Sequence, residues 1–190
     1  MRRNMQDSSQ GSDLSSRGSF YQFTATWGLY MGLLVSVLTV LTVGLRIVDY
    51  AWALTLLELL VYFLMAGRAM SLYRRSLSKG YITYGTAFKV GAMQSLFSAI
   101  IVVAIYFVMI EVVVPDYPEF LYQETLKVMR QSVTDVDQLE QVMQKNPIFH
   151  LLRSPLFHTF STLFNSITYG LIASLIMAIF IKRVPQTRNI

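Results

Sequence analysis

The sequence predicts an all-α, polytopic membrane protein with four transmembrane helices in two hairpins and an external amphipathic helical loop. Of its 190 residues, 54% are hydrophobic and 14% are charged, which exceeds the apolar content typical of a soluble domain. Charged residues are absent from three long blocks, and a fourth block contains Glu58 alone; each block is close to the ~20 residues that cross ~30 Å of hydrocarbon. These blocks predict spans at about residues 20–45, 50–67, 87–111 and 155–181.

The segments around the first three spans have the composition of a tail and two connections. Residues 1–19 are rich in Ser, Gly and Asp and lack apolar periodicity, so we expect a disordered cytoplasmic tail. The short run RIVDY joins the first two spans into a hairpin. A basic linker then leads to the third span, with turn signals at Gly80 and Gly85.

Residues 112–153 are the sizeable region expected outside the membrane. Pro118 suits the first turn of a helix, and Thr134 with Asp137 resembles a capping box, so we expect two short amphipathic helices. Ser154 and Pro155 resemble the cap and first residue of the last span. Residues 186–190 are expected to form a cytoplasmic tail.

The basic residues predict the orientation. The N-terminal tail, the middle linker and the C-terminal tail together hold 11 of the 16 Lys and Arg residues. Because basic residues are retained on the cytoplasmic side, both termini are expected there. The net charge of +5 is therefore interpreted as a topology signal, with lipid headgroups and not nucleic acid as the partner. The candidate headgroup contacts are Arg74, Arg75, Lys79 and Lys89.

Small residues recur at every fourth position of three spans, forming what we call small-residue ladders. Such spacing lets two helix backbones approach closely within a membrane. We expect the third and fourth spans to pack on each other; in the alternative, one ladder is a docking face for another subunit. The ladders are Gly28, Gly32 and Ser36; Ala87, Gly91, Ser95 and Ala99; and Ser166, Gly170, Ser174 and Ala178.

Glu58 is an acidic residue near the middle of the second span. A charged side chain at that depth costs about 2.5 to 3.5 kcal/mol on insertion scales, so it is a candidate intramembrane polar site. Three interpretations stay open. Glu58 is a protonated acid that donates a hydrogen bond to Gln94 or Asn165, a group that handles protons or cations, or a polar contact to a partner protein.

Catalysis has no support in the sequence. The chain has no cysteine, and it lacks a nucleophile elbow, a P-loop and a metalloprotease motif. His150 and His158 flank the start of the last span and are interpreted as interfacial residues. We therefore expect no enzyme activity, catalytic residue, cofactor or metal.

The run YRRSLSKGYITYGTAFKVG, which begins at Tyr73, resembles the signature of an uncharacterised family of small four-helix membrane proteins found in Bacteroidota and classed as a domain of unknown function. The resemblance implies a bacterial inner membrane, and it gives neither an activity nor a role for Glu58. The matching positions are Arg74, Gly80, Tyr84, Gly85, Ala87, Phe88, Lys89 and Gly91.

Taken together, these features favour a non-enzymatic accessory or scaffold subunit that packs with other membrane proteins or with itself. The alternative is a small oligomeric transporter or lipid-handling protein that uses Glu58. A third interpretation, an enzyme at the headgroup level, has the least support. An aqueous cavity that reaches Glu58 would favour the transporter.

Overall fold

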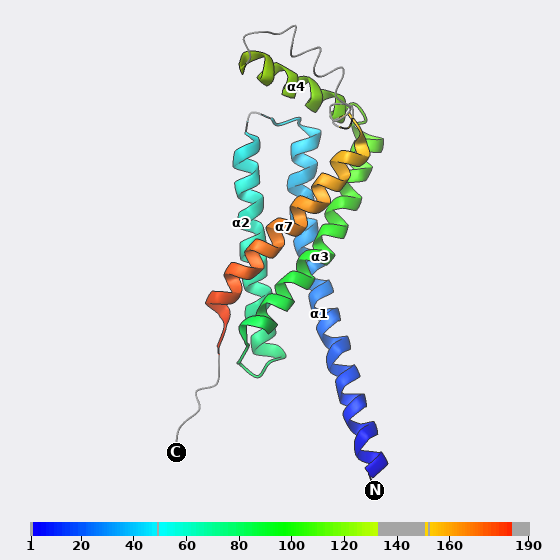
Figure 1. Ribbon diagram of the computed structural model, residues 1–190, viewed down its shortest axis with the longest axis vertical. Helices are drawn as coiled ribbons and strands as arrows, with labels where there is room; N and C mark the ends of the chain where they lie inside the picture. The colour runs from blue at the N-terminus through cyan, green and yellow to red at the C-terminus, as the bar shows by residue number, and fades with distance from the viewer. Residues whose placement is uncertain (1, 49, 133–150, 152, 184–190) are drawn as a thin grey trace.

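The structure is a computed structural model that describes residues 2–48, 50–132, 151 and 153–183, and in these ranges it contains helices and no strand. Four long helices form one bundle, and a shorter helix lies across one end of it (Figure 1). The helices are α1 (Arg2–Gly44), α2 (Ala51–Ser76), α3 (Tyr84–Val108), α4 (Tyr117–Ser132) and α7 (Pro155–Ile181), and α3 continues into a π-helical turn at Met109–Val113.

Each long helix contains a segment that is long and apolar enough to cross a membrane. These segments are Gly18–Gly44, Trp52–Ser76, Tyr84–Val113 and Pro155–Ile181. Large apolar side chains cover their outer surface, where Phe160 and Phe180 are about two-thirds or more exposed, as expected for side chains that meet lipid. The predicted fold class, an all-α membrane protein with four candidate spans, is confirmed, and a further helix, α4, lies outside these spans.

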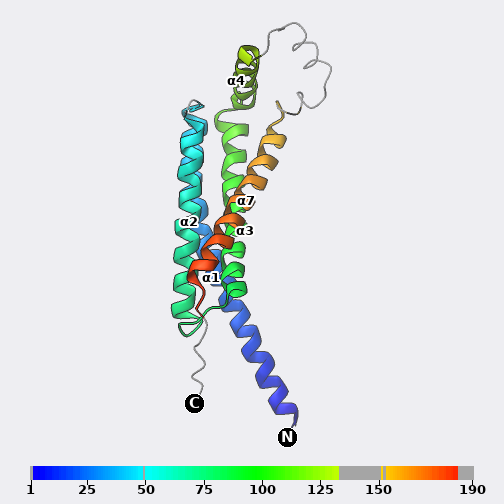
Figure 2. The ribbon, with the colours of Figure 1, turned by 60° about the vertical axis from the view of Figure 1, so that its left-hand side comes forward.

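Two helices extend beyond the predicted spans. Helix α1 begins at Arg2, so it continues through the segment expected to be a disordered tail, and this extension leans away from the bundle (Figure 2). Adding a residue to an existing helix costs less than nucleating one, and residues 2–17 contain no proline to stop it. Helix α2 likewise passes Gly67 and ends only before Lys79 and Gly80, whose positive φ values of 50° and 87° turn the chain.

Part of the predicted external region lies outside the described residues. Pro118 is the second residue of α4, in the first turn as predicted. The expected second amphipathic helix, with Thr134 and Asp137, falls in residues 133–150. His150 and the C-terminal tail 186–190 are outside the described ranges as well.

The ladder of the first span faces α3. A methyl group on Gly28 would lie 2.6 Å from Cβ of Phe97 and 2.8 Å from the carbonyl oxygen of Gln94. One turn later, a methyl group on Gly32 would lie 2.9 Å from Cβ of Ile101. Because these distances are too short for any side chain, only glycine permits the observed approach of the two backbones.

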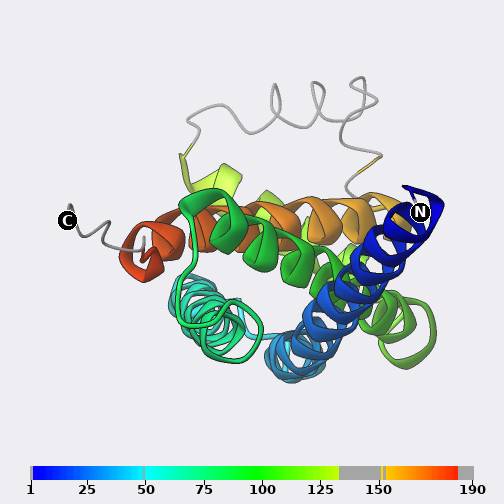
Figure 3. The ribbon, with the colours of Figure 1, turned by 90° about the horizontal axis from the view of Figure 1, so that it is seen from below.

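The ladders of α3 and α7 face each other. A methyl group on Gly91 would lie 2.8 Å from Cβ of Ser174, and one on Gly170 would collide with Ser95. Both serines donate their hydroxyl protons within their own helix, over 2.8 Å from Ser95 to the Gly91 carbonyl and 2.6 Å from Ser174 to the Gly170 carbonyl. The ladders are therefore used inside this chain, and the bundle seen end-on is compact around α3 (Figure 3).

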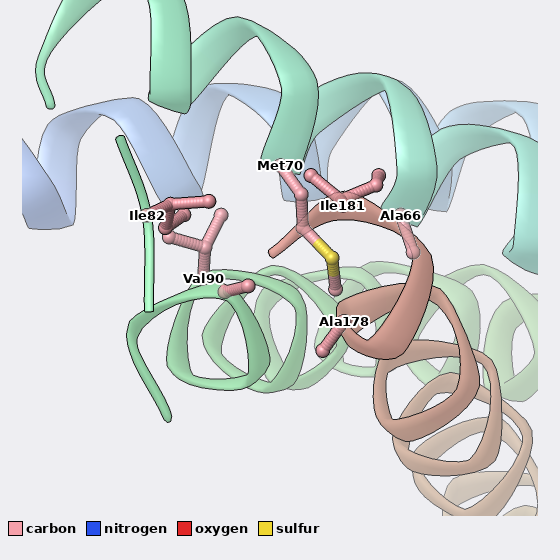
Figure 4. Close-up of a cluster of buried hydrophobic side chains, with 7 residues drawn as sticks. Ala66, Met70, Ile82, Val90, Ala178 and Ile181 are labelled. Carbon is pink, nitrogen blue, oxygen red and sulfur yellow. The ribbon is translucent and has the colours of Figure 1, made fainter. Parts of the chain in front are cut away.

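A cluster of apolar side chains joins α2, α3 and α7 at the end opposite α4 (Figure 4). Its members are Ala66, Met70, Ile82, Ala87, Val90, Ala178 and Ile181. Beside this cluster, the backbone of Ile82 pairs with that of Arg183 through two hydrogen bonds of 2.9 Å, and Arg74 donates to the Ile181 carbonyl over 2.9 Å. The turn between α2 and α3 is therefore fixed to the C-terminal end of α7.

Candidate functional site

A polar cavity of about 210 Å³ lies in the half of the bundle nearest α4. Helix α7 crosses the bundle obliquely, so it lies beside α2 at its C-terminal end and diverges from α2 toward α4 (Figures 1 and 2). The cavity occupies the resulting space between α1, α2 and α7. The polar members of its lining are Thr39, Thr42, Thr55, Glu58, Tyr106, Tyr117, Thr162, Asn165, Ser166 and Tyr169.

Glu58 is the one charged group of this cavity. Among the described residues that line it, no other is acidic and none is basic. The described part of the chain also offers no hydrogen bond or ion pair to the Glu58 carboxyl. Its position, seven residues into α2, corresponds to a depth of roughly 10 Å from the start of that helix. The carboxyl is therefore free to interact with a small ligand in the cavity.

Oxygen acceptors line the same cavity as the carboxyl. The Thr39 hydroxyl donates to the Val35 carbonyl over 3.1 Å, and the Thr42 hydroxyl donates to the Leu38 carbonyl over 2.8 Å. Because both protons are used within α1, the lone pairs of these two oxygens remain for the cavity. A carboxyl, threonine oxygens and the Asn165 amide form a lining that suits a proton, a water cluster or a small cation.

The inner end of the cavity is closed by the packed core. Tyr62, one turn beyond Glu58 on α2, is 0% exposed, and its hydroxyl lies near those of Ser98 and Ser166. Neither the Tyr62 hydroxyl nor that of Ser98 has a hydrogen-bond partner among the described residues. Buried hydroxyls without partners cost free energy. Polar groups thus continue past the cavity into a region that is otherwise apolar.

The outer end is covered by Tyr117, the first residue of α4. Its side chain is 5% exposed and packs with Val43, Tyr106 and Ile110. Burial raises the pKa of Tyr117 above its usual value, so its hydroxyl stays protonated at neutral pH. This hydroxyl is therefore a neutral hydrogen-bonding group at the α4 end of the cavity.

Two arginines hold α4 over that end. Arg46, just after α1, donates to Asp116 over 2.6 Å and lies 5.3 Å from the centre of the Phe120 ring. Arg153, just before α7, pairs with Glu119 over 3.1 Å. Since these contacts come from both sides of the bundle, α4 is positioned by ion pairs and by the packing of Tyr117.

The three predicted members of the intramembrane polar site do not meet at one place. Glu58 and Asn165 line the same cavity. Gln94 is instead buried between α1 and α3, where its Nε2 lies 3.4 Å from the sulfur of Met31. His158 is in the first turn of α7, and in the described part of the chain no three His, Cys, Asp or Glu side chains come together.

The predicted headgroup contacts lie at the end opposite α4. Arg75, Lys79 and Lys89 are exposed there, whereas Arg74 is partly buried and contacts the Ile181 carbonyl. Of the resembled signature, Gly80 lies in the turn, Arg74 contacts the end of α7 from within α2, and Ala87 and Gly91 are packing residues. The signature therefore maintains a turn and a helix contact, at a distance from the cavity.

Most of the polar lining was not among the predicted site residues, although the sequence contains a signal for it. Thr162, Asn165, Ser166 and Tyr169 follow the i, i+3, i+4, i+7 spacing of one helix face. A polar stripe at this spacing inside an apolar span predicts a polar interior surface. Single threonines in a span are common, so each one alone gives no signal.

Comparison with known proteins gives one match. The family model described as "Protein of unknown function (DUF4199)" matches residues 26–183, a segment that includes most of the first span and the whole of the other three. No curated protein and no solved structure matches the chain.

Proposed function

We propose that this chain, which belongs to the family described as "Protein of unknown function (DUF4199)", is a small membrane protein that handles protons or small cations, with Glu58 as the binding group. The description of the family names no activity, so the proposal is drawn from the cavity. The observation that supports it is the cavity that joins Glu58 to oxygen acceptors on four other helices. In an apolar environment an unpaired carboxylate is costly, so a carboxyl there holds a proton or a cation.

The size of the cavity limits its ligand. Sites for drug-sized molecules occupy roughly 300–1,000 Å³, more than the 210 Å³ found here. A proton with a few waters, or a small cation with part of its hydration shell, fits the space. The lack of a basic side chain in the described lining argues against an anionic solute.

The cavity is closed toward the far end by Tyr62 and its neighbours, so passage across the bundle needs a second conformation. The buried hydroxyls of Tyr62 and Ser98 supply polar groups along that route. Four helices leave little room for a wider pathway, and we therefore propose that the working unit is a homo-oligomer.

We also propose the orientation and location. The exposed basic residues at the end opposite α4 support cytoplasmic termini and an external α4, and therefore a cavity on the external half of the bundle. A bacterial inner membrane and a non-enzymatic role remain part of this proposal. A reporter fused to each terminus tests the orientation, and an external signal from either terminus contradicts it.

The function is tested by flux into vesicles. We would reconstitute the full chain into liposomes that contain a pH-sensitive dye, impose a potassium diffusion potential, and compare wild type with Glu58→Gln. Wild type is expected to carry flux above empty vesicles, and Glu58→Gln to reduce it by about tenfold or more, because the amide cannot titrate. The dye is then replaced by a sodium indicator to compare the two ions.

The matched control is Glu111→Gln, which removes an exposed acid that does not line the cavity. This variant is expected to keep wild-type flux. Wild-type flux no greater than that of empty vesicles, or full flux in Glu58→Gln, contradicts the proposal.

The accessory or scaffold role is a second candidate, and the outer face of α7 favours it. Asn165 is exposed near the middle of this span and also lines a groove of about 580 Å³ on the outer side of α7. Phe157, Phe160 and Phe164 surround it there. An exposed amide in a span is a polar group suited to bind a second helix.

The two candidates are separated by isolating the tagged protein from its native membrane in mild detergent. Stoichiometric recovery of a second membrane protein, lost in Asn165→Leu, supports the accessory role. Recovery of a discrete oligomer of this chain alone supports the first candidate. Ser161→Leu, which alters the same groove without removing the amide, is the control.

A further inference from the structure

A groove of about 460 Å³ runs between α2 and α7 at the end opposite α4, separate from the cavity of Glu58. Its walls are apolar toward the middle of the bundle, where Phe63, Leu64 and Met177 lie. Toward the end of α2 they become basic, with Arg68 and Arg75. The groove thus has an apolar part and a cationic part in the order that a phospholipid requires.

The two arginines are available to a ligand. Both are exposed, and they are seven residues apart, which places them on the same face of α2. The described residues offer no hydrogen bond or ion pair to either guanidinium. Their neighbour Arg74 is occupied by the Ile181 carbonyl. No charge in the described part of the chain therefore compensates Arg68 and Arg75.

The depth of the arginines matches the headgroup layer. Trp52 is 68% exposed at the other end of α2, where an interfacial aromatic residue is expected. From Trp52, the helical rise places Arg68 roughly 24 Å and Arg75 roughly 35 Å along the helix. The hydrocarbon boundary, roughly 30 Å away, falls between them. A phosphate at that boundary is within reach of both side chains.

We propose that this groove binds one anionic phospholipid, with its phosphate between Arg68 and Arg75 and an acyl chain along Phe63, Leu64 and Met177. Guanidinium groups bind phosphate through paired hydrogen bonds, and basic pockets between spans on the cytoplasmic side bind acidic headgroups. Because the groove is cationic, it is expected to bind an anionic lipid more tightly than a zwitterionic one. The proposal does not depend on the function of Glu58.

The test is native mass spectrometry of the full chain in detergent, titrated with phosphatidylglycerol or with phosphatidylcholine of the same acyl chains. Wild type is expected to bind one phosphatidylglycerol at a saturable site, about tenfold tighter than phosphatidylcholine. The double variant Arg68→Gln, Arg75→Gln is expected to weaken phosphatidylglycerol binding by about 25-fold, the product of about fivefold for each basic residue.

The matched control removes two other exposed basic residues at the same end, by Lys79→Asn and Lys89→Gln; asparagine tolerates the positive φ of residue 79. Equal binding of the two lipids by wild type, or equal weakening in the control, overturns the proposal. So does full competition by inorganic phosphate, which would identify a site for the free ion. A thermal melt without added lipid verifies that each variant is folded.

Discussion

Arg46 and Asp116 join the end of α1 to the start of α4 through a hydrogen bond of 2.6 Å, directly above the cavity that contains Glu58. Both side chains are partly open to water, with exposures of 41% and 61%. An exposed ion pair contributes about 0 to 1 kcal/mol, so it cannot hold the bundle together. It can, however, fix the position of α4.

Arg46→Gln is therefore expected to loosen α4 with little effect on the bundle. The change removes the ion pair with Asp116 and the contact with the Phe120 ring. The free energy of unfolding should fall by about 1 kcal/mol or less, while hydrogen exchange in α4 becomes faster. Lys127→Gln, which affects an ion pair within α4 alone, is the control. Unchanged exchange in Arg46→Gln would show that Tyr117 packing is sufficient.

Gly28→Ala is expected to destabilise the α1–α3 contact. The added methyl group would lie 2.8 Å from a backbone oxygen of α3, which cannot move aside without moving the helix. Overpacking of this kind costs about 1 to 3 kcal/mol, measurable by unfolding in detergent. Gly85→Ala is the matched control, because no atom lies within 4 Å of its added methyl group. Equal stability of the two variants would show that the backbones are farther apart than described.

Glu58→Leu is expected to fold at least as well as wild type. No described residue donates to or accepts from the Glu58 carboxyl, so the substitution breaks no hydrogen bond among them. It also removes an acid whose insertion costs about 2.5 to 3.5 kcal/mol. Thermal unfolding in detergent measures the effect. A clear loss of stability would support the other interpretation, in which Glu58 joins two helices.

Gln94→Met is expected to leave stability unchanged or to raise it by about 1 kcal/mol. The Gln94 oxygen is buried and has no hydrogen-bond partner in the described part of the chain, and its Nε2 contacts only the sulfur of Met31. Removing an unsatisfied polar group without leaving a cavity is neutral or favourable. A double-mutant cycle of Gln94→Met with Glu58→Leu should give a coupling energy near zero. Strong coupling would contradict the separate placement of these two residues.

The membrane spans and the helix-packing faces were predictable, because each depends on a pattern within one segment of the sequence. Four spans follow from apolar blocks with little or no charge, and the small-residue ladders that contain Gly91 and Gly170 indicated helix faces that the structure brings together. The ends of the helices were less predictable. The apolar block of the second span ends before Arg68, but helix α2 continues to Ser76. After α2 the chain turns at Lys79 and Gly80, which adopt positive φ values, and such backbone angles have no hydropathy signal.

The candidate site was predictable only in part. Glu58 is conspicuous because one charge interrupts an apolar block, but its neighbours depend on the oblique crossing of α7. With that crossing, Asn165 lines the same cavity as Glu58, whereas Gln94 lies beside Met31. Spacing along one helix indicates which face is polar. It does not indicate which face of another helix lies opposite.

The central claim, that water reaches Glu58 through a polar cavity, is tested most directly by thiol labelling. The chain has no cysteine, so Glu58→Cys introduces a single reactive site. A small cationic thiosulfonate needs water and a thiolate, so it should label Glu58→Cys in intact cells from the external side. Leu57→Cys, on the exposed apolar surface of the same helix, and Tyr62→Cys, in the packed core, should stay unlabelled. If Glu58→Cys is no more reactive than these two variants, the cavity is dry and the proposed function is contradicted.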